Sequence, residues 1–134
     1  MQMQEFTITA NEVWANVRQM HHLTTNNAEH LALGDFYDQW ADLTDSFTET
    51  YYGKYGRKPT SGLIQLQSAA TAPEYIASLR DTVKEAHNTL TATEDIDLRN
   101  ILADILQLIN HTLYRLTQSL CTTSAHTSQH TTKQ

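Results

Sequence analysis

The sequence predicts an all-α fold, a four-helix bundle in which one long crossover joins the second helix to the third. Three observations predict it. Apolar residues recur every three or four positions along four separate segments, capping and glycine signals separate those segments, and no strand-like alternation of useful length occurs. The 134 residues and the 40% apolar content suit one domain with a single core. We place this domain at residues 1–121, followed by a polar tail at 122–134.

The first helix has a complete start signal. Thr9 and Glu12 form a capping box, and Ile8 and Val13 occupy the positions of a hydrophobic staple around it. These signals predict a helix over residues 10–24.

The second helix begins at Asn26, where Glu29 stands three residues later as in an N-terminal cap. Gly53 and Gly56 provide a C-terminal stop, so the helix is expected to end near Tyr52. Its core-facing stripe is spaced by three and four residues and comprises Leu33, Phe36, Trp40, Leu43 and Phe47.

The segment 54–72 is interpreted as the crossover. Its apolar residues Leu63, Ile64 and Leu66 predict a short turn of helix within it. Thr71 and Glu74 form a second capping box, which starts a third helix that reaches Leu90. The fourth helix carries the strongest apolar stripe, from Leu98 to Leu120. Two short links and one long link give the ferritin-like connectivity. The tail lacks periodicity and is expected to be frayed or to act as a contact arm.

Composition narrows the function classes. The formal net charge of −6 argues against a general nucleic-acid binder, which normally carries a basic stripe. The single cysteine, Cys121, rules out an intramolecular disulfide and favours a reducing compartment. No apolar run approaches the roughly 20 residues of a membrane span, and the N-terminus lacks the features of a secretory signal. We therefore expect a cytoplasmic location, the host cytoplasm if a phage encodes the chain.

One flank of the second helix is acidic. No Lys or Arg occurs between Asn26 and Gly53, whereas six carboxylates do: Glu29, Asp35, Asp38, Asp42, Asp45 and Glu49. On a helical wheel, His30 shares an arc of about 100° with three of them, Asp38, Asp45 and Glu49. A solvated polar face is the alternative, although such faces usually mix both signs. Carboxylates with imidazole suit Fe(II), Mn(II) or Zn(II), so we expect a cation from a metal or from a partner surface.

The runs at 22–30, 36–37 and 45–49, followed by Gly53, resemble the Dps-like branch of the ferritin-like superfamily, and most closely the short Dps-like proteins of bacteriophages. The resemblance covers about Val13 to Leu120. It implies a di-iron oxidation site across a two-fold dimer interface, with histidines from one subunit and an Asp/Glu pair from its mate. Such dimers assemble into twelve-subunit shells that oxidise and store iron.

The metal ligands that the resemblance implies are His22, His30, Asp45 and Glu49, with Asp38 as a further candidate. His21 is the alternative to His22, because the first histidine stands nearer to His30 than in typical members. Gly34 replaces a carboxylate that the family usually has, and Asp38 would have to substitute for it. The lack of a Lys-rich N-terminal arm argues against DNA coating.

These observations favour a Dps-like iron-binding and storage protein, with Fe(II) oxidation as its expected activity, that forms a homo-oligomer through the second helix, from a dimer up to a dodecamer. The alternative is a catalytically silent helical bundle, in a phage context, whose acidic face binds a basic partner. Gly34 favours this alternative. One aromatic-basic cluster, a weak signal for a partner or nucleic acid, comprises Tyr51, Tyr52, Tyr55, Lys54, Arg57 and Lys58. His87 and His111 are interpreted as ordinary helix-flank histidines.

Overall fold

The computed structural model describes the backbone of residues 1–67 and 70–133 and the side chains of residues 1–67 and 70–118. Its helices are α1 (Met3–Leu23), α2 (Asn27–Tyr55), α3 (Ala72–Thr89) and α4 (Ile96–Lys133), with a short 3-10 helix, η1 (Thr93–Asp95), before α4. No strand occurs in the described parts of the chain. The prediction of an all-α four-helix bundle is confirmed. Within these parts, no helix is both long and apolar enough to cross a bilayer.

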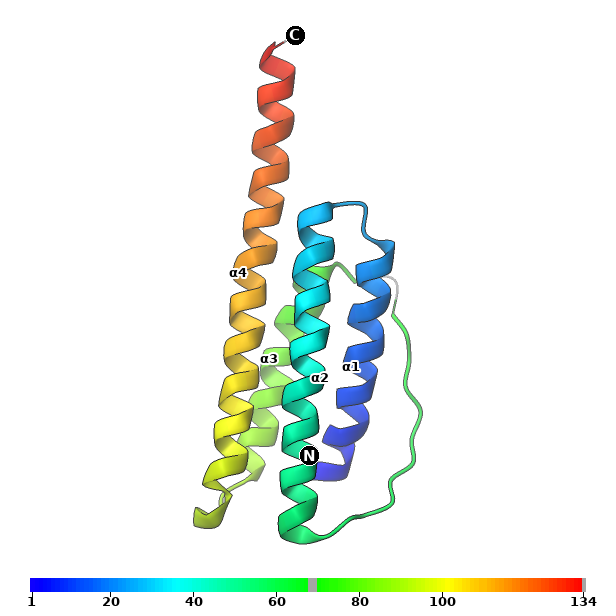
Figure 1. Cartoon of the computed structure of the whole chain (residues 1–134), viewed down its shortest axis with the longest axis vertical. Coiled ribbons are helices and arrows are strands. Elements are labelled where there is room, and N and C mark those ends of the chain that lie inside the picture. Colours follow the sequence, from blue (N-terminus) through cyan, green and yellow to red (C-terminus); the bar gives the residue numbers. More distant parts are fainter. Residues whose placement is uncertain (68–69, 134) are drawn as a thin grey trace.

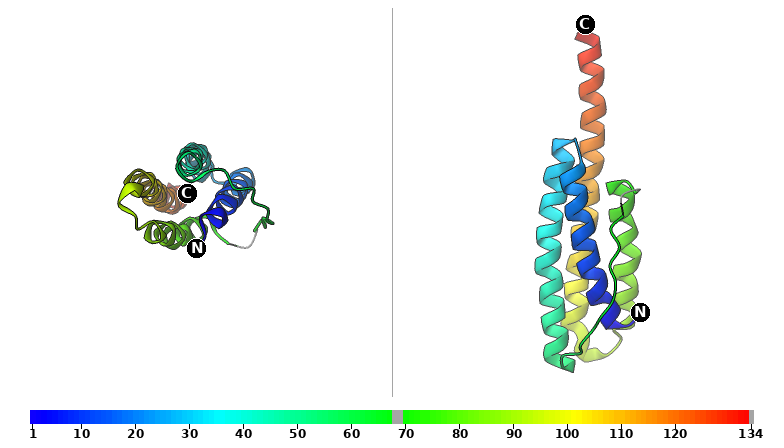
Figure 2. Two further views of the ribbon diagram at one scale, coloured as in Figure 1. Left: turned by 90° about the horizontal axis from the view of Figure 1, so that it is seen from below. Right: turned by 90° about the vertical axis from the view of Figure 1, so that its right-hand side faces the viewer.

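The helices pack as two antiparallel pairs, α1 with α2 and α3 with α4 (Figure 1). The two pairs meet mainly through α2 and α4, while α1 and α3 touch more lightly. After α2 the chain runs back along the whole bundle before α3 begins, so α2 and α3 run parallel (Figures 1 and 2). The long second link therefore crosses from one end of the bundle to the other.

Trp40 of α2 anchors the core. Its side chain is fully buried, stacks on Phe36 with ring centroids 5.7 Å apart, and donates its indole N–H to the carbonyl oxygen of Ala10 at 2.9 Å. Near one end of the bundle, Phe6 of α1 meets the ring of Phe47 of α2 at 5.1 Å. The Trp40–Ala10 hydrogen bond and the Phe6–Phe47 contact fix the register of α1 against α2, because both join a residue of α1 to a residue of α2.

The predicted start of the first helix is wrong. α1 begins at Met3, so Thr9 lies inside the helix and caps nothing, and the cap residue Gln2 makes no side-chain cap bond. Starting earlier adds almost two turns and buries Met3 and Phe6 in the core. Burial of two large apolar side chains outweighs a capping box worth about 1 kcal/mol.

The other predicted starts are confirmed. The side chain of Asn26 accepts the backbone N–H of Glu29 at 2.9 Å, and Thr71 accepts that of Glu74 at 3.3 Å. α2 runs one turn past the expected end, to Tyr55. Gly56 then ends it with a φ of 85°, a conformation that glycine adopts without steric cost.

The crossover contains no helix in its described residues 56–67, so the expected turn at Leu63, Ile64 and Leu66 is wrong. All three of these side chains are exposed. The segment is instead held extended along α1 by Asn16, whose amide donates to the carbonyl of Gln65 at 3.0 Å and accepts the N–H of Gln67 at 2.6 Å. An extended chain reaches further per residue than a helix, and this segment must span the bundle.

α4 continues as a helix to Lys133, and thus includes residues 122–133 of the segment that the sequence set apart as a polar tail. Its far end extends beyond the other three helices (Figure 1). The side chains of His126 and His130 lie outside the described residues.

Candidate functional site

Two histidines, His21 and His30, join the end of α1 to the start of α2, and we call this pair the histidine clasp. The rings of His21, near the end of α1, and His30, in the second turn of α2, stack with centroids 3.7 Å apart and planes 16° apart. Nδ1 of His21 lies 2.6 Å from the carbonyl oxygen of His30, and Nδ1 of His30 lies 2.7 Å from the carbonyl oxygen of His21. The carbonyl of His21 is one of the last four of α1, which lack helical partners, so His30 satisfies it.

These bonds place a hydrogen on Nδ1 of both rings. A carbonyl oxygen only accepts, so each Nδ1 donates, and Nε2 is the ring nitrogen left for a ligand. Histidines that bind metals almost always donate their other ring N–H in this way, commonly to a backbone carbonyl. The pair is thus preorganised both as a helix clasp and as two imidazole ligands.

Gly34 accommodates the His21 ring. A Cβ at Gly34 would lie 2.9 Å from Cε1 and 3.2 Å from Nδ1 of His21, closer than side chains pack. The resemblance implies a carboxylate side chain at position 34, but the His21 ring occupies that space. Position 34 is a glycine because the ring packs against it, and the sequence did not reveal this contact.

Aromatic side chains continue this face of α1 and α2. Tyr37 meets His21 edge to face at 5.3 Å and Trp14 at 6.1 Å, and the guanidinium of Arg18 lies 5.3 Å from the Trp14 ring centre. Trp14 is 38% exposed, which is unusual for so large an aromatic side chain. The face thus presents apolar rings to its surroundings next to the histidines.

His22, the first choice from the sequence, lies apart from the clasp. Its side chain is exposed, and its ring centroid is 5.3 Å from that of His21. The structure pairs His30 with His21, the alternative that the sequence left open.

The predicted carboxylate ligands Asp38, Asp45 and Glu49, together with Asp42, form an exposed acidic row on α2. Asp38, Asp42, Asp45 and Glu49 are all exposed, and none joins an ion pair among the described residues. Asp35 differs, because Arg115 of α4 binds its carboxylate at 2.7 Å. The four acids of the row therefore have no cation from their own chain within the described region.

The histidines and the acids do not meet within one copy. Asp45 stands 15 residues beyond His30 on the same helix, about 22 Å along its axis at 1.5 Å per residue. Asp38 is about 12 Å away by the same measure. Among residues 1–67 and 70–118, no three His, Cys, Asp or Glu side chains converge in a group able to hold a metal ion.

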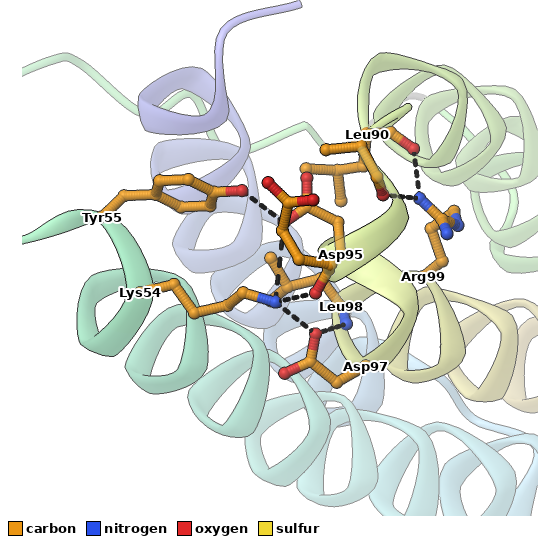
Figure 3. A network of polar contacts seen from close by, with 9 residues as sticks. Lys54, Tyr55, Leu90, Asp95, Asp97, Leu98 and Arg99 are labelled. Atoms are coloured by element: carbon orange, nitrogen blue, oxygen red, sulfur yellow. Dashed lines mark hydrogen bonds and ion pairs between the residues drawn. The ribbon is translucent and has the colours of Figure 1, made fainter.

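The aromatic-basic cluster that the sequence suggested is largely engaged inside the fold. Lys54 contacts Asp97 at 2.7 Å, Asp95 at 3.6 Å and the carbonyl of Glu94, while the hydroxyl of Tyr55 donates to Asp95 (Figure 3). These bonds join the end of α2 to the start of α4. Arg57 and Lys58 are the exposed cations of the cluster that join no ion pair among the described residues, so the chain itself neutralises only Lys54 of the cluster's three cations.

The same network shifts three pKa values. The hydrogen bond to Asp97 raises the pKa of Lys54 above its usual range, and that bond lowers the pKa of Asp97. The hydrogen bond from the Tyr55 hydroxyl to the Asp95 carboxylate raises the pKa of Tyr55 to about 12. All three shifts favour the protonation states that form the network.

A protein family of unknown function, DUF5856, matches residues 21–116 of the chain, which is 96 of its 134 residues. The match begins at His21 and includes α2, α3 and the first half of α4. No curated protein and no solved structure matches the chain.

Proposed function

We propose, for a chain that belongs to the family of unknown function DUF5856, that it is a Dps-like iron-binding and storage protein whose metal site forms between two copies. His21 and His30 come from one copy, and Asp45 and Glu49 come from the other. The observation that carries the proposal is the histidine pair with both Nδ1 atoms committed to backbone carbonyls.

The connectivity supports this assignment. Two antiparallel helix pairs joined by one end-to-end crossover are the arrangement of ferritin-like bundles (Figure 1). Proteins of that class build their iron sites from histidine and carboxylate side chains on facing helices. The fold alone does not specify the function, so the site must carry the argument.

The ring geometry supports two ions rather than one. Each Nε2 lone pair lies in the plane of its ring, and lines in nearly parallel planes do not converge on a single point. With the planes 16° apart, the two Nε2 lone pairs do not converge on one ion, so each histidine would bind its own ion. Carboxylate oxygens with imidazole nitrogens suit Fe(II).

A second copy brings the carboxylates within reach. If two α2 helices pack antiparallel about a two-fold axis beside Tyr37 and Asp38, His30 of one copy lies opposite Asp45 of the other. This follows because the two positions are equally distant from the midpoint between residues 37 and 38. In the same arrangement, Arg18 and the two histidines of one copy lie opposite the acidic end of α2 in the other copy. The arrangement also covers Trp14, which is exposed in one copy.

In this proposal ferrous iron is the substrate. Two ferrous ions each give one electron to dioxygen, which takes up two protons and leaves as hydrogen peroxide, and the ferric product is stored as mineral. The chain's own residues bind the ions as neutral imidazoles and as carboxylates, and each Nδ1–H bond holds its ring in place.

The test combines assembly and chemistry. Light scattering should give a mass of a dimer or larger, and anaerobic Fe(II) followed by air should produce the broad near-ultraviolet absorbance of ferric iron. The pair Asp45→Asn and Glu49→Gln should reduce that absorbance at least tenfold. Asp104→Asn, which changes an exposed acid of α4, is the matched control. A monomer that binds no iron would refute the proposal.

One observation favours a second function, a silent bundle that binds a basic partner. The His21 ring fills the position beside Gly34 where the family's carboxylate would stand, so one ligand is lost. In that case the acidic row would bind a polycation, and Fe(II) would leave no ferric signal. Binding of polylysine that weakens in both the double variant and high salt, without iron oxidation, would identify this alternative.

A further inference from the structure

A second site lies on the opposite side of the bundle. Between α3 and α4, a cleft of about 260 Å³ has an apolar floor made by Val83, Leu102 and Leu106. Figure 2 shows the α3–α4 pair, in yellow-green and yellow, across the bundle from the α1–α2 pair in blue and cyan. The cleft therefore shares no residue with the proposed metal site.

The polar side chains that line the cleft are one ammonium, one imidazole and one amide. Lys84, His87 and Asn88 of α3 form one wall, and no carboxylate lines the cleft. Among the described residues, none of these three side chains makes an ion pair or a hydrogen bond. Lys84 thus keeps an unpaired ammonium beside an apolar surface, in a chain whose net charge is −6.

The residues that flank the cleft carry both signs. Arg80 is exposed one helical turn before Lys84 on α3, and the exposed Glu85 and Asp104 adjoin the lining residues Lys84 and Ala103. Lys84 is therefore the charged group of the cleft itself. An apolar floor with an ammonium at its edge is complementary to a molecule with an apolar tail and one anionic head.

We propose that this cleft binds a small amphipathic carboxylate, with its tail on Leu102 and Leu106 and its head at Lys84 and His87. Lys84 supplies the charge, and the imidazole of His87 and the amide of Asn88 supply neutral hydrogen bonds. The volume of about 260 Å³ lies just below the usual range of small-molecule pockets, so it suits a small ligand with a short tail.

Octanoate is the probe, titrated into the full-length protein and followed by the NMR signals of α3 and α4. Saturable shifts should centre on Val83, His87 and Leu102. Octylamine, which has the same tail with a positive head, should bind at least tenfold more weakly. Acetate, which has the carboxylate head without the tail, should also bind at least tenfold more weakly than octanoate.

Two variants locate the site. Lys84→Met keeps the apolar stem and removes the charge, and it should weaken octanoate at least fivefold; Lys58→Met, on the exposed crossover, is the control and should have no effect. Ala103→Leu adds bulk at an exposed lining position and should abolish saturable binding while the fold is kept. Equal binding of octylamine, an unchanged affinity in Lys84→Met, or no binding of octanoate by the wild type would each overturn the inference.

Discussion

Gly34 and Gly53 both lie within α2, but the surroundings of only one of them require a glycine. A Cβ at Gly34 would collide with the His21 ring, whereas a Cβ at Gly53 would meet nothing within 4 Å. Glycine inside a helix costs roughly 0.5–1 kcal/mol relative to alanine. At Gly34 that cost makes room for the histidine clasp, but the monomer shows no contact that requires a glycine at position 53.

The two glycines give a matched prediction. Gly53→Ala should raise the free energy of unfolding by roughly 0.5–1 kcal/mol, the difference in helix propensity. Gly34→Ala should show no such gain, because the His21 ring must move and its hydrogen bond to the carbonyl of His30 is lost. Chemical denaturation measures both, and NMR contacts between the two histidine rings report the clasp. An equal gain in both variants would show that His21 does not pack on Gly34.

At the scale of elements, one buried side chain secures the crossover. Asn16 is fully buried in α1, and both ends of its amide bind the backbone of the extended segment, at Gln65 and Gln67. Glu12 adds a contact to the N–H of Gln65 at 3.3 Å. The exposed apolar side chains of this segment contribute little burial, so its position depends largely on these hydrogen bonds.

Asn16→Ala should therefore release the crossover. The expected loss is about 1–2 kcal/mol of stability, since the backbone groups that it frees are re-solvated. Trypsin should cleave the variant after Arg57 several-fold faster than the wild type, which mass spectrometry detects. Asn11→Ala, an exposed change in the same helix, is the control. Unchanged cleavage would mean that other contacts hold the segment.

The junction of α2 with α4 predicts a dependence on alkaline pH. The pKa of Tyr55 is raised from 10.0 to about 12, so the folded state binds more protons than the unfolded state in that interval. Stability is therefore complete below pH 10 and falls as pH rises towards 12. The raised pKa of Lys54 acts in the same direction. The lowered pKa of Asp97 has the opposite pH dependence: it stabilises the folded state at pH values above the ordinary pKa of an aspartate, and this stabilisation is lost as the pH falls.

Tyr55→Phe should flatten the alkaline decline in stability. Denaturant midpoints measured from neutral pH to pH 12 test this, with Tyr114→Phe as the control at an exposed tyrosine. Tyrosinate absorbance of the wild type should show two late-titrating groups, because burial also raises the pKa of Tyr75, and Tyr55→Phe should remove one of them. If both variants lose stability as steeply as the wild type, the Tyr55–Asp95 bond is absent in solution.

At the scale of the whole molecule, charge is distributed unevenly. Asp38, Asp42, Asp45 and Glu49 follow each other at helical spacing, and each like-charged i,i+3 or i,i+4 pair costs roughly 0.2–0.5 kcal/mol. On the other side of the bundle, Lys84 stands unpaired beside a cleft without carboxylates. Among the described residues, the acidic row thus lacks a cation to neutralise it, and Lys84 lacks an anion.

Assembly should depend on divalent cations if two copies share the acidic row. Under anaerobic conditions, Fe(II) or Mn(II) should raise the mass seen by light scattering, and a chelator should lower it, because an ion bound between copies stabilises the assembled state. The double variant Asp45→Asn with Glu49→Gln should lose this response. A mass that is the same with metal, with chelator and in the variant would contradict the inter-subunit site.

The sequence by itself determined the all-α class, the helix starts at Asn26 and Thr71, and the crossover between α2 and α3. These depend on local signals, namely helical periodicity and side chains that cap the backbone three residues away. The start of α1 was not decided locally, because burial of Phe6 against Phe47 outweighs the capping box at Thr9. The crossover likewise follows Asn16, which is about fifty residues away in the sequence.

For the site, the sequence identified His30, the acidic row and Gly34 as residues that need an explanation. Only the tertiary structure paired His30 with His21 and filled the space beside Gly34 with a ring. Only the structure assigned Lys54 and Tyr55 to an internal junction. Sequence spacing places residues on a helix face, but the choice between adjacent His21 and His22 depends on how α1 turns against α2, which long-range packing determines.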